Sequence, residues 1–186
     1  MSLPAFATLL ERLLFTPGRI AKLALLRQWF ATQPDPERGI GLAALTDELV
    51  LRTAKPALLR EIVAARTDPE LLRMSRDYVG DFAETAALIW PLRAGVNAPP
   101  PGLAEVMEAM QGAAKGELPV LIADWMDRLD ASGRIALAKL VTGGLRVGVS
   151  GRLARVALAE WSGIEIGDIE EVWHGVTPPY TKSRGT

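Results

Sequence analysis

Apolar residues recur three and four positions apart along almost the whole chain, and this spacing limits the fold more than any other feature of the sequence. Near the start the repeating positions are Phe6, Leu9, Leu10, Leu13 and Leu14. A longer stripe with the same spacing occupies the second half, at Leu118, Leu121, Ile122, Trp125, Met126 and Leu129. Such stripes form one face of an α-helix, and we find no stretch that we would assign to a strand. We therefore predict an all-α fold in which helices pack in pairs.

Helix starts and chain breaks indicate how these helices are grouped. Asp68 followed by Pro69 has the composition of an N-cap and a first helical residue. Three consecutive prolines, Pro99 to Pro101, cannot be helical and favour an extended segment. We therefore predict one multi-helix domain over residues 1–180, with lobe 1 at about 4–92, a linker at 93–101 and lobe 2 at about 102–175. Residues 181–186 are predicted to be an interdomain linker or a tail.

Composition excludes several classes of protein. The 186 residues carry a net charge of −1, so the chain does not bind nucleic acid through its overall charge and any anion-binding surface must be local. With no cysteine and one histidine, His174, the chain lacks the usual ligands of a zinc site. No charge-free apolar run reaches the length of a membrane span, and the N-terminus lacks a basic start and a cleavage site. We expect a cytoplasmic monomer that does not contact a membrane.

Positive charge is concentrated in one segment of the second half. Between residues 128 and 155 the only acid is Asp130, against six cations: Arg128, Arg134, Lys139, Arg146, Arg152 and Arg155. Six positive charges less one negative charge give the segment a charge of +5, and acidic residues follow it directly, from Glu160 to Glu171. Segregation of this kind predicts a local electrostatic field that attracts anions.

A glycine-rich turn lies in the middle of this basic segment. Gly143, Gly144 and Gly148 have no side chains, so backbone N–H groups there can approach a ligand closely. Ser150 is a candidate N-cap for the following helix, whose N-terminus would attract phosphate, and Arg146 would project between the glycines. The alternative is that the glycines only allow the chain to turn and that the cations are solvated.

The predicted DNA-binding residues follow from this turn. They are Lys139, Thr142, Gly143, Gly144, Arg146, Gly148, Ser150 and Arg152. Two cations near the N-terminus are weaker candidates, Arg19 and Lys22. Cations, hydroxyls and helix N-termini around a duplex contact its phosphates without reading its bases.

The turn also carries a resemblance to a known family. Gly143, Leu145, Arg146 and Gly148 fill a pattern of glycine, any residue, Leu-Arg, a hydrophobic residue and glycine. This stretch resembles the N-terminal DNA-binding domain of ATP-dependent DNA ligases, and is closest to the bacterial single-chain ligases.

Two further segments resemble the same family in the same order. Gly80, Asp81, Ala83 and Glu84 match its Gly-Asp-Leu-Ala-Glu segment, with a phenylalanine in place of the leucine. A weaker match near the N-terminus places Lys22 at the family's lysine position. The three matches together span most of the chain.

The resemblance implies an all-helical domain that holds the minor-groove side of a nicked duplex, with Gly143 and Gly148 close to the DNA backbone beside Arg146. In the family this domain precedes an adenylation domain and an OB-fold domain, which use ATP and Mg²⁺ to seal nicks in repair, replication and recombination. None of the five lysines of this chain begins the catalytic Lys-x-Asp-Gly motif. We therefore expect no catalytic, cofactor-binding or metal-binding residue here, and no ligation by this chain alone.

Two other functions remain open. A helix-turn-helix regulator would read bases with a recognition helix, but residues 151–161 offer arginines and neither asparagine nor glutamine. A helical protein-interaction module would expose an apolar groove and would not bind DNA.

Overall fold

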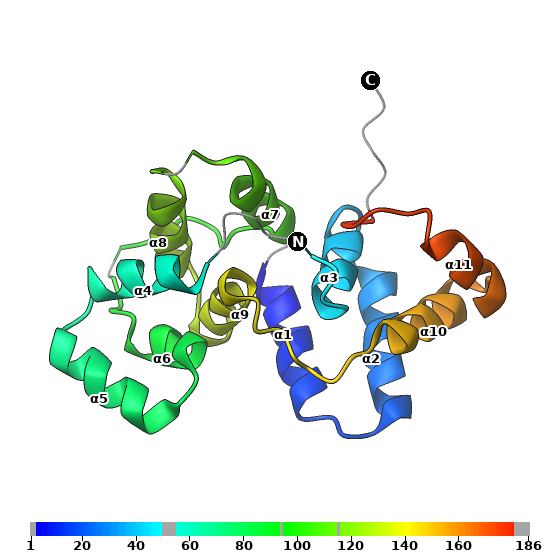
Figure 1. Ribbon diagram of the computed structural model, residues 1–186, viewed down its shortest axis with the longest axis horizontal. Coiled ribbons are helices and arrows are strands. Elements are labelled where there is room, and N and C mark those ends of the chain that lie inside the picture. Colours follow the sequence, from blue (N-terminus) through cyan, green and yellow to red (C-terminus); the bar gives the residue numbers. More distant parts are fainter. Residues whose placement is uncertain (1–2, 50–54, 94, 115, 181–186) are drawn as a thin grey trace. The chain divides into compact units, whose positions relative to one another are not determined.

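A computed structural model describes residues 3–49, 55–93, 95–114 and 116–180. Over these residues it contains eleven α-helices and no strand (Figure 1). The all-α prediction is therefore confirmed. The predicted start at Pro69 is also confirmed, because α5 (Pro69–Val79) begins there and the Asp68 side chain accepts hydrogen bonds from the backbone N–H groups of Glu70 and Leu71. The predicted tail at 181–186 lies outside the described residues.

The helices form two compact units, and each unit combines segments that are distant in sequence. Unit 1 takes its described residues from 9–49 and 145–180, and unit 2 takes them from 3–8, 55–93, 95–114 and 116–144. Helix α1 (Leu3–Leu14) contributes to both units. The other helices of unit 1 are α2 (Arg19–Thr32), α3 (Glu37–Leu45), α10 (Gly151–Ser162) and α11 (Ile166–Trp173). The other helices of unit 2 are α4 (Pro56–Ala64), α5, α6 (Phe82–Ile89), α7 (Leu103–Gly112), α8 (Leu118–Arg128) and α9 (Ala131–Thr142).

This division differs from the two lobes predicted from the prolines. Residues 93 and 95–101 lie inside unit 2, not between two units. Pro101 is buried, and its carbonyl oxygen accepts a hydrogen bond of 2.8 Å from the backbone N–H of Leu3. The carbonyl oxygen of Pro99 accepts a hydrogen bond of 3.2 Å from Arg128. The prolines prevent helix formation as expected, but the segment packs against its own unit and does not act as a spacer.

The core of unit 1 is built around the contact between α2 and α10. From α2, Leu26, Trp29 and Phe30 are buried, and from α10 the small side chains Ala154 and Ala157 are buried. Small residues on one helix let the large residues of the other approach its backbone closely. This packing brings the start of α2 and the start of α10, more than a hundred residues apart in sequence, into one unit.

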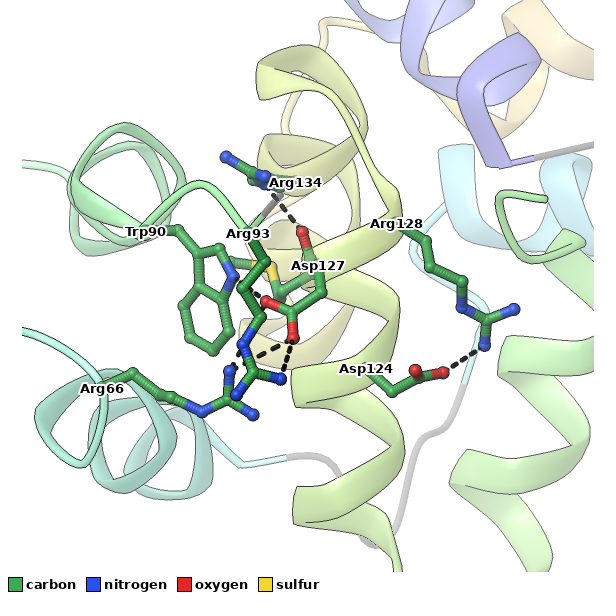
Figure 2. Close-up of polar contacts among 8 residues, drawn as sticks. Arg66, Trp90, Arg93, Asp124, Asp127, Arg128 and Arg134 are labelled. Atoms are coloured by element: carbon green, nitrogen blue, oxygen red, sulfur yellow. Dashed lines mark hydrogen bonds and ion pairs between the residues drawn. The ribbon is translucent and has the colours of Figure 1, made fainter. Parts of the chain in front are cut away.

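The core of unit 2 contains a buried carboxylate, Asp127 of α8, whose side chain is 6% exposed (Figure 2). It accepts a 2.8 Å hydrogen bond from Trp90 Nε1 and forms ion pairs with the guanidinium groups of Arg66, at 3.1 Å, and Arg93, at 3.3 Å. Arg134, also buried, donates from Nε to a carbonyl oxygen of α8 at 2.8 Å. A buried charge requires such partners, so these arginines join the segments that follow α4 and α6 to α8.

Candidate nucleic-acid interface

A cleft of about 280 Å³ lies in unit 1 where α2 and α10 begin. It is lined by Pro17, Arg19, Lys22, Gly148, Ser150, Arg152 and Leu153. Three of these seven residues are cations and none is acidic. The cleft therefore brings the two weaker candidates from the N-terminal segment together with three candidates from the glycine-rich turn.

Both helices present their N-terminal ends at this cleft. Helix α10 begins after Ser150, whose Oγ accepts a 3.1 Å hydrogen bond from the backbone N–H of Leu153, so the predicted N-cap is confirmed. Helix α2 begins at Arg19 after Gly18, which is extended and provides no side-chain cap. The first backbone N–H groups of a helix have no partner within the helix and carry partial positive charge. They add to the positive charge of the side chains.

Lys22 connects the two helix starts. Its Nζ donates hydrogen bonds to the carbonyl oxygens of Val147, at 2.8 Å, and Gly148, at 3.3 Å. Gly148 has a φ of +67°, and a Cβ on it would lie 2.6 Å from the Lys22 ammonium. Glycine is therefore favoured here by its backbone conformation, and a side chain at this position would displace the Lys22 ammonium. Lys22 fixes the turn before α10 and keeps its charge at the cleft.

Three arginines of unit 1 remain available to a ligand. Arg19 and Arg152 line the cleft, and Arg146 lies in the segment that leads into α10. All three are exposed, and none has a hydrogen-bond or ion-pair partner within the described part of the chain. A free guanidinium group offers several planar N–H donors that suit the oxygens of a phosphate.

The glycines that precede this segment belong to unit 2 and have a different role. Gly143 ends α9 in the left-handed conformation, with a φ of 74°. The backbone N–H groups of Gly143 and Gly144 both donate to the carbonyl oxygen of Lys139, and the Thr142 hydroxyl donates to that of Ala138 at 2.9 Å. The prediction that these N–H groups face a ligand was wrong, because they cap the end of α9.

Lys139 is engaged within unit 2. Its Nζ lies 3.3 Å from Asp81 Oδ2 and 3.4 Å from Glu84 Oε1, and its side chain is 13% exposed. Burial acts to raise the pKa of Asp81, but the backbone N–H of Glu84 and the Lys139 ammonium outweigh it and hold this pKa below its ordinary value. Asp81 is also the N-cap of α6. The second family-like segment therefore provides a helix cap and an ion-pair partner for Lys139. Because carboxylates balance its positive charge, Lys139 attracts a phosphate less strongly than an unpaired cation would.

The basic segment as a whole is also largely neutralised. Arg128 pairs with an aspartate one turn earlier on α8, Arg134 is buried against a backbone carbonyl, and Arg155 lies 3.9 Å from a glutamate of α11. Of the six cations counted in the sequence, two are without a partner among the residues described: Arg146 and Arg152. The prediction of one field of charge +5 was wrong, because acids outside the segment pair with three of its six cations and a fourth, Arg134, is buried.

The lining of the cleft is cationic and contains one hydroxyl group. Its one hydroxyl, on Ser150, caps α10, and its lining contains no carboxylate or histidine. The described residues contain no group of three or more acidic or histidine side chains that could hold a metal ion. Nor does any helix in the described ranges have the length and apolar character to cross a membrane. A recess with three cations and two helix N-termini can hold an anionic group.

A scan against protein-family models gave no match, and a search of curated proteins gave no significant similarity. The function is therefore inferred from the chemistry of the cleft together with the motifs of the sequence.

Proposed function

We propose that the chain binds duplex DNA without reading its sequence, by holding backbone phosphate in the cleft formed by α2 and α10. The observation that carries this proposal is that Arg19, Lys22 and Arg152 meet at two helix N-termini in a recess with no acidic lining residue. Phosphate contacts from cations and helix N-termini fix a protein on a duplex but carry no sequence information. Arg146 is a further exposed cation of the same unit.

The composition of α10 supports binding that is independent of sequence. A recognition helix that reads adenine uses asparagine or glutamine, and α10 contains neither. Its exposed arginine, Arg152, lies in the first turn at the cleft, where it can contact phosphate. A base-reading regulator is therefore the less favoured alternative.

Together with the family-like motifs, this leads us to propose that the chain is the DNA-binding domain of a bacterial ATP-dependent DNA ligase, acting in repair, replication and recombination. Its partners would be a nicked duplex and the covalently linked adenylation and OB-fold domains, which would use ATP and Mg²⁺. The role of this chain would be to position the nick while those domains act on it. It has no Lys-x-Asp-Gly motif and would not ligate DNA alone.

One observation favours a second function, a protein-interaction module. Unit 1 also has a hollow of about 520 Å³ with mainly apolar walls, including Phe30, Leu42, Trp161, Ile169 and Trp173. A hollow of this kind could receive apolar side chains of another protein. If this were the main function, the cations at the cleft would be ordinary surface charges and the chain would not bind DNA.

The proposal is tested by fluorescence anisotropy with labelled duplexes of several unrelated sequences, nicked and intact, titrated with salt. If about three phosphates are neutralised, the logarithm of the affinity should fall with the logarithm of the salt concentration with a slope of roughly −3. The affinities for unrelated sequences should agree. Absence of binding at low salt, or a strong preference for one sequence, would contradict the proposal.

A further inference from the structure

The apolar hollow of unit 1 continues into apolar surface that is exposed to solvent. Trp161, Ile164, Val172 and Val176 line the hollow, and each is also between 36% and 59% exposed. They are all of the exposed large apolar side chains between residues 145 and 180. Apolar groups that gather at one place on the surface, and do not scatter singly, mark a contact with another molecule.

The hollow and the cationic cleft lie at opposite ends of the same pair of helices. Arg19 and Arg152 line the cleft from the first turns of α2 and α10, whereas Phe30 and Trp161 line the hollow from their last turns. The ring centroids of Phe30 and Trp161 are 6.0 Å apart. At a rise of about 1.5 Å per residue, the two ends of α10 are about 15 Å apart. A phosphate held in the cleft therefore does not occupy the hollow.

The charge next to the hollow is negative, in contrast to the cleft. Asp35 lines the hollow, and Glu165 and Asp168 lie one helical turn before residues of its wall on α11. Glu165 and Asp168 are exposed, and their carboxylates have no hydrogen-bond or ion-pair partner within the described part of the chain. The one cation of the lining, Arg38, is paired with Asp35 at 3.6 Å. Two carboxylates beside the apolar wall are thus available to a cationic ligand.

We propose that the hollow docks a segment of a partner protein that places large apolar side chains in it and lysine or arginine beside them. The volume of about 520 Å³ is within the range of roughly 300–1,000 Å³ that is usual for ligand pockets. A small molecule inside the hollow would leave the exposed wall residues in water, whereas an amphipathic segment covers the hollow and its surroundings together. Pairing of its cations with Glu165 and Asp168 selects basic partners over acidic ones. This docking goes beyond the proposed DNA binding and does not depend on it.

The same carboxylates argue against two other occupants. The phosphates of a nucleic acid and the headgroups of an anionic bilayer would approach unpaired negative charges, which repel them. A second copy of this chain is a further occupant, and the measurements below distinguish it from a partner protein.

The test begins with a selection on the whole chain from a phage-displayed library of random peptides of about twelve residues, long enough for roughly three helical turns. We expect enrichment of peptides that combine large apolar side chains with several lysines or arginines. Ile164→Ser/Val172→Ser should lower the affinity for labelled copies of these peptides roughly tenfold in fluorescence anisotropy, because two apolar contacts are lost. Leu88→Ser/Val120→Ser is the matched control and should bind as wild type does, because both residues are exposed on helices of unit 2.

A second pair of variants tests the charges. Glu165→Gln/Asp168→Asn should lower the affinity for the enriched peptides about threefold at low salt, and the difference should disappear as salt screens the ion pairs. Glu61→Gln/Glu108→Gln is its control, because it removes two exposed carboxylates of unit 2 and changes the net charge equally. This control should have no effect on peptide binding.

Several results would overturn the inference. They are a selection that enriches no peptide, enrichment of acidic peptides, and unchanged peptide affinity in Ile164→Ser/Val172→Ser. Dimerisation of wild type in sedimentation velocity, lost in the same variant, would also overturn it by assigning the hollow to a second copy. DNA binding by this variant should equal that of wild type, because the cleft is at the other end of the helix pair. Failure of the docking would therefore leave the proposed function standing, and a wild type that does not bind DNA would leave the docking standing.

Discussion

Two groups of cations, one in each unit, have different surroundings. In unit 2, Arg66 and Arg93 are paired with Asp127 and Lys139 is paired with Asp81. In unit 1 the cations at the cleft meet no acidic lining residue. The comparison shows that the availability of a cation depends on the elements packed against it and not on its neighbours in the sequence. The predictions below test whether these paired cations of unit 2 stabilise the fold while the cations at the cleft of unit 1 bind the ligand.

The largest change in the free energy of unfolding is expected from Asp127→Ala in unit 2. Removal of this buried carboxylate leaves the Trp90 Nε1 hydrogen without its acceptor and the Arg66 guanidinium without its ion-pair partner. Breaking a buried charged pair destabilises a protein by about 3 kcal/mol. Urea unfolding followed by circular dichroism measures this change. Asp77→Ala is the control, because Asp77 is 72% exposed and its partner Arg73 is 63% exposed, and its loss should cost less than about 1 kcal/mol. Equal losses in the two variants would show that the Asp127 cluster has no special structural role.

A smaller loss of stability is expected when either positive-φ glycine of the turn, Gly143 or Gly148, is replaced by alanine, and DNA binding should distinguish the two variants. Gly148→Ala and Gly143→Ala should each cost about 1 kcal/mol of unfolding free energy, because both positions have positive φ. The new Cβ at position 148 would also displace the Lys22 ammonium, whereas at position 143 it would meet nothing within 4 Å. Anisotropy should therefore show weaker DNA binding only for Gly148→Ala. If Gly143→Ala weakened binding equally, the glycine of unit 2 would also have to be assigned to the interface.

The smallest effect concerns the acid stability of unit 2. The pKa of Asp81 is lowered in the folded chain, so its contribution to stability is present above its unfolded pKa and is lost as the pH falls through the folded pKa. Asp81→Asn should therefore be less stable than wild type at pH 7, and the difference should shrink in acid. Unfolding free energies at pH 7 and pH 3 measure this. Asp77→Asn, at an exposed position on α5, is the control for the removal of a surface carboxylate. A difference that stays constant with pH would mean that the charge of Asp81 does not stabilise the fold.

Much of the fold follows from local patterns in the sequence. The three-and-four spacing of apolar residues is a property of single helices, and Asp68 and Ser150 cap helices within three residues of their own position. These features do not depend on the rest of the chain, and they were predicted correctly. The placement of the proline segment was not predicted correctly. Its packing depends on contacts with Leu3 and Arg128, which are distant in sequence.

The candidate site was predictable only in part for the same reason. Lys22 and Val147 are 125 positions apart, and Lys139 and Asp81 are 58 positions apart. A count of charges along the sequence could not show that the first pair builds the cleft and that the second neutralises a cation. The resemblance did direct attention to Lys22 and to the turn, but not to Pro17 and Leu153, which complete the lining.

The most direct test of the comparison replaces two cations in each unit. Arg19→Gln/Arg152→Gln removes the free cleft arginines of unit 1, and Arg128→Gln/Lys139→Gln removes two paired cations of unit 2. Each variant loses two positive charges, so any general effect of net charge on DNA binding is the same. Salt titration with a nicked duplex should show a slope less steep by about 2 for the unit 1 variant and an unchanged slope for the unit 2 variant. Equal slopes in the two variants would contradict the assignment of DNA binding to the cleft of unit 1.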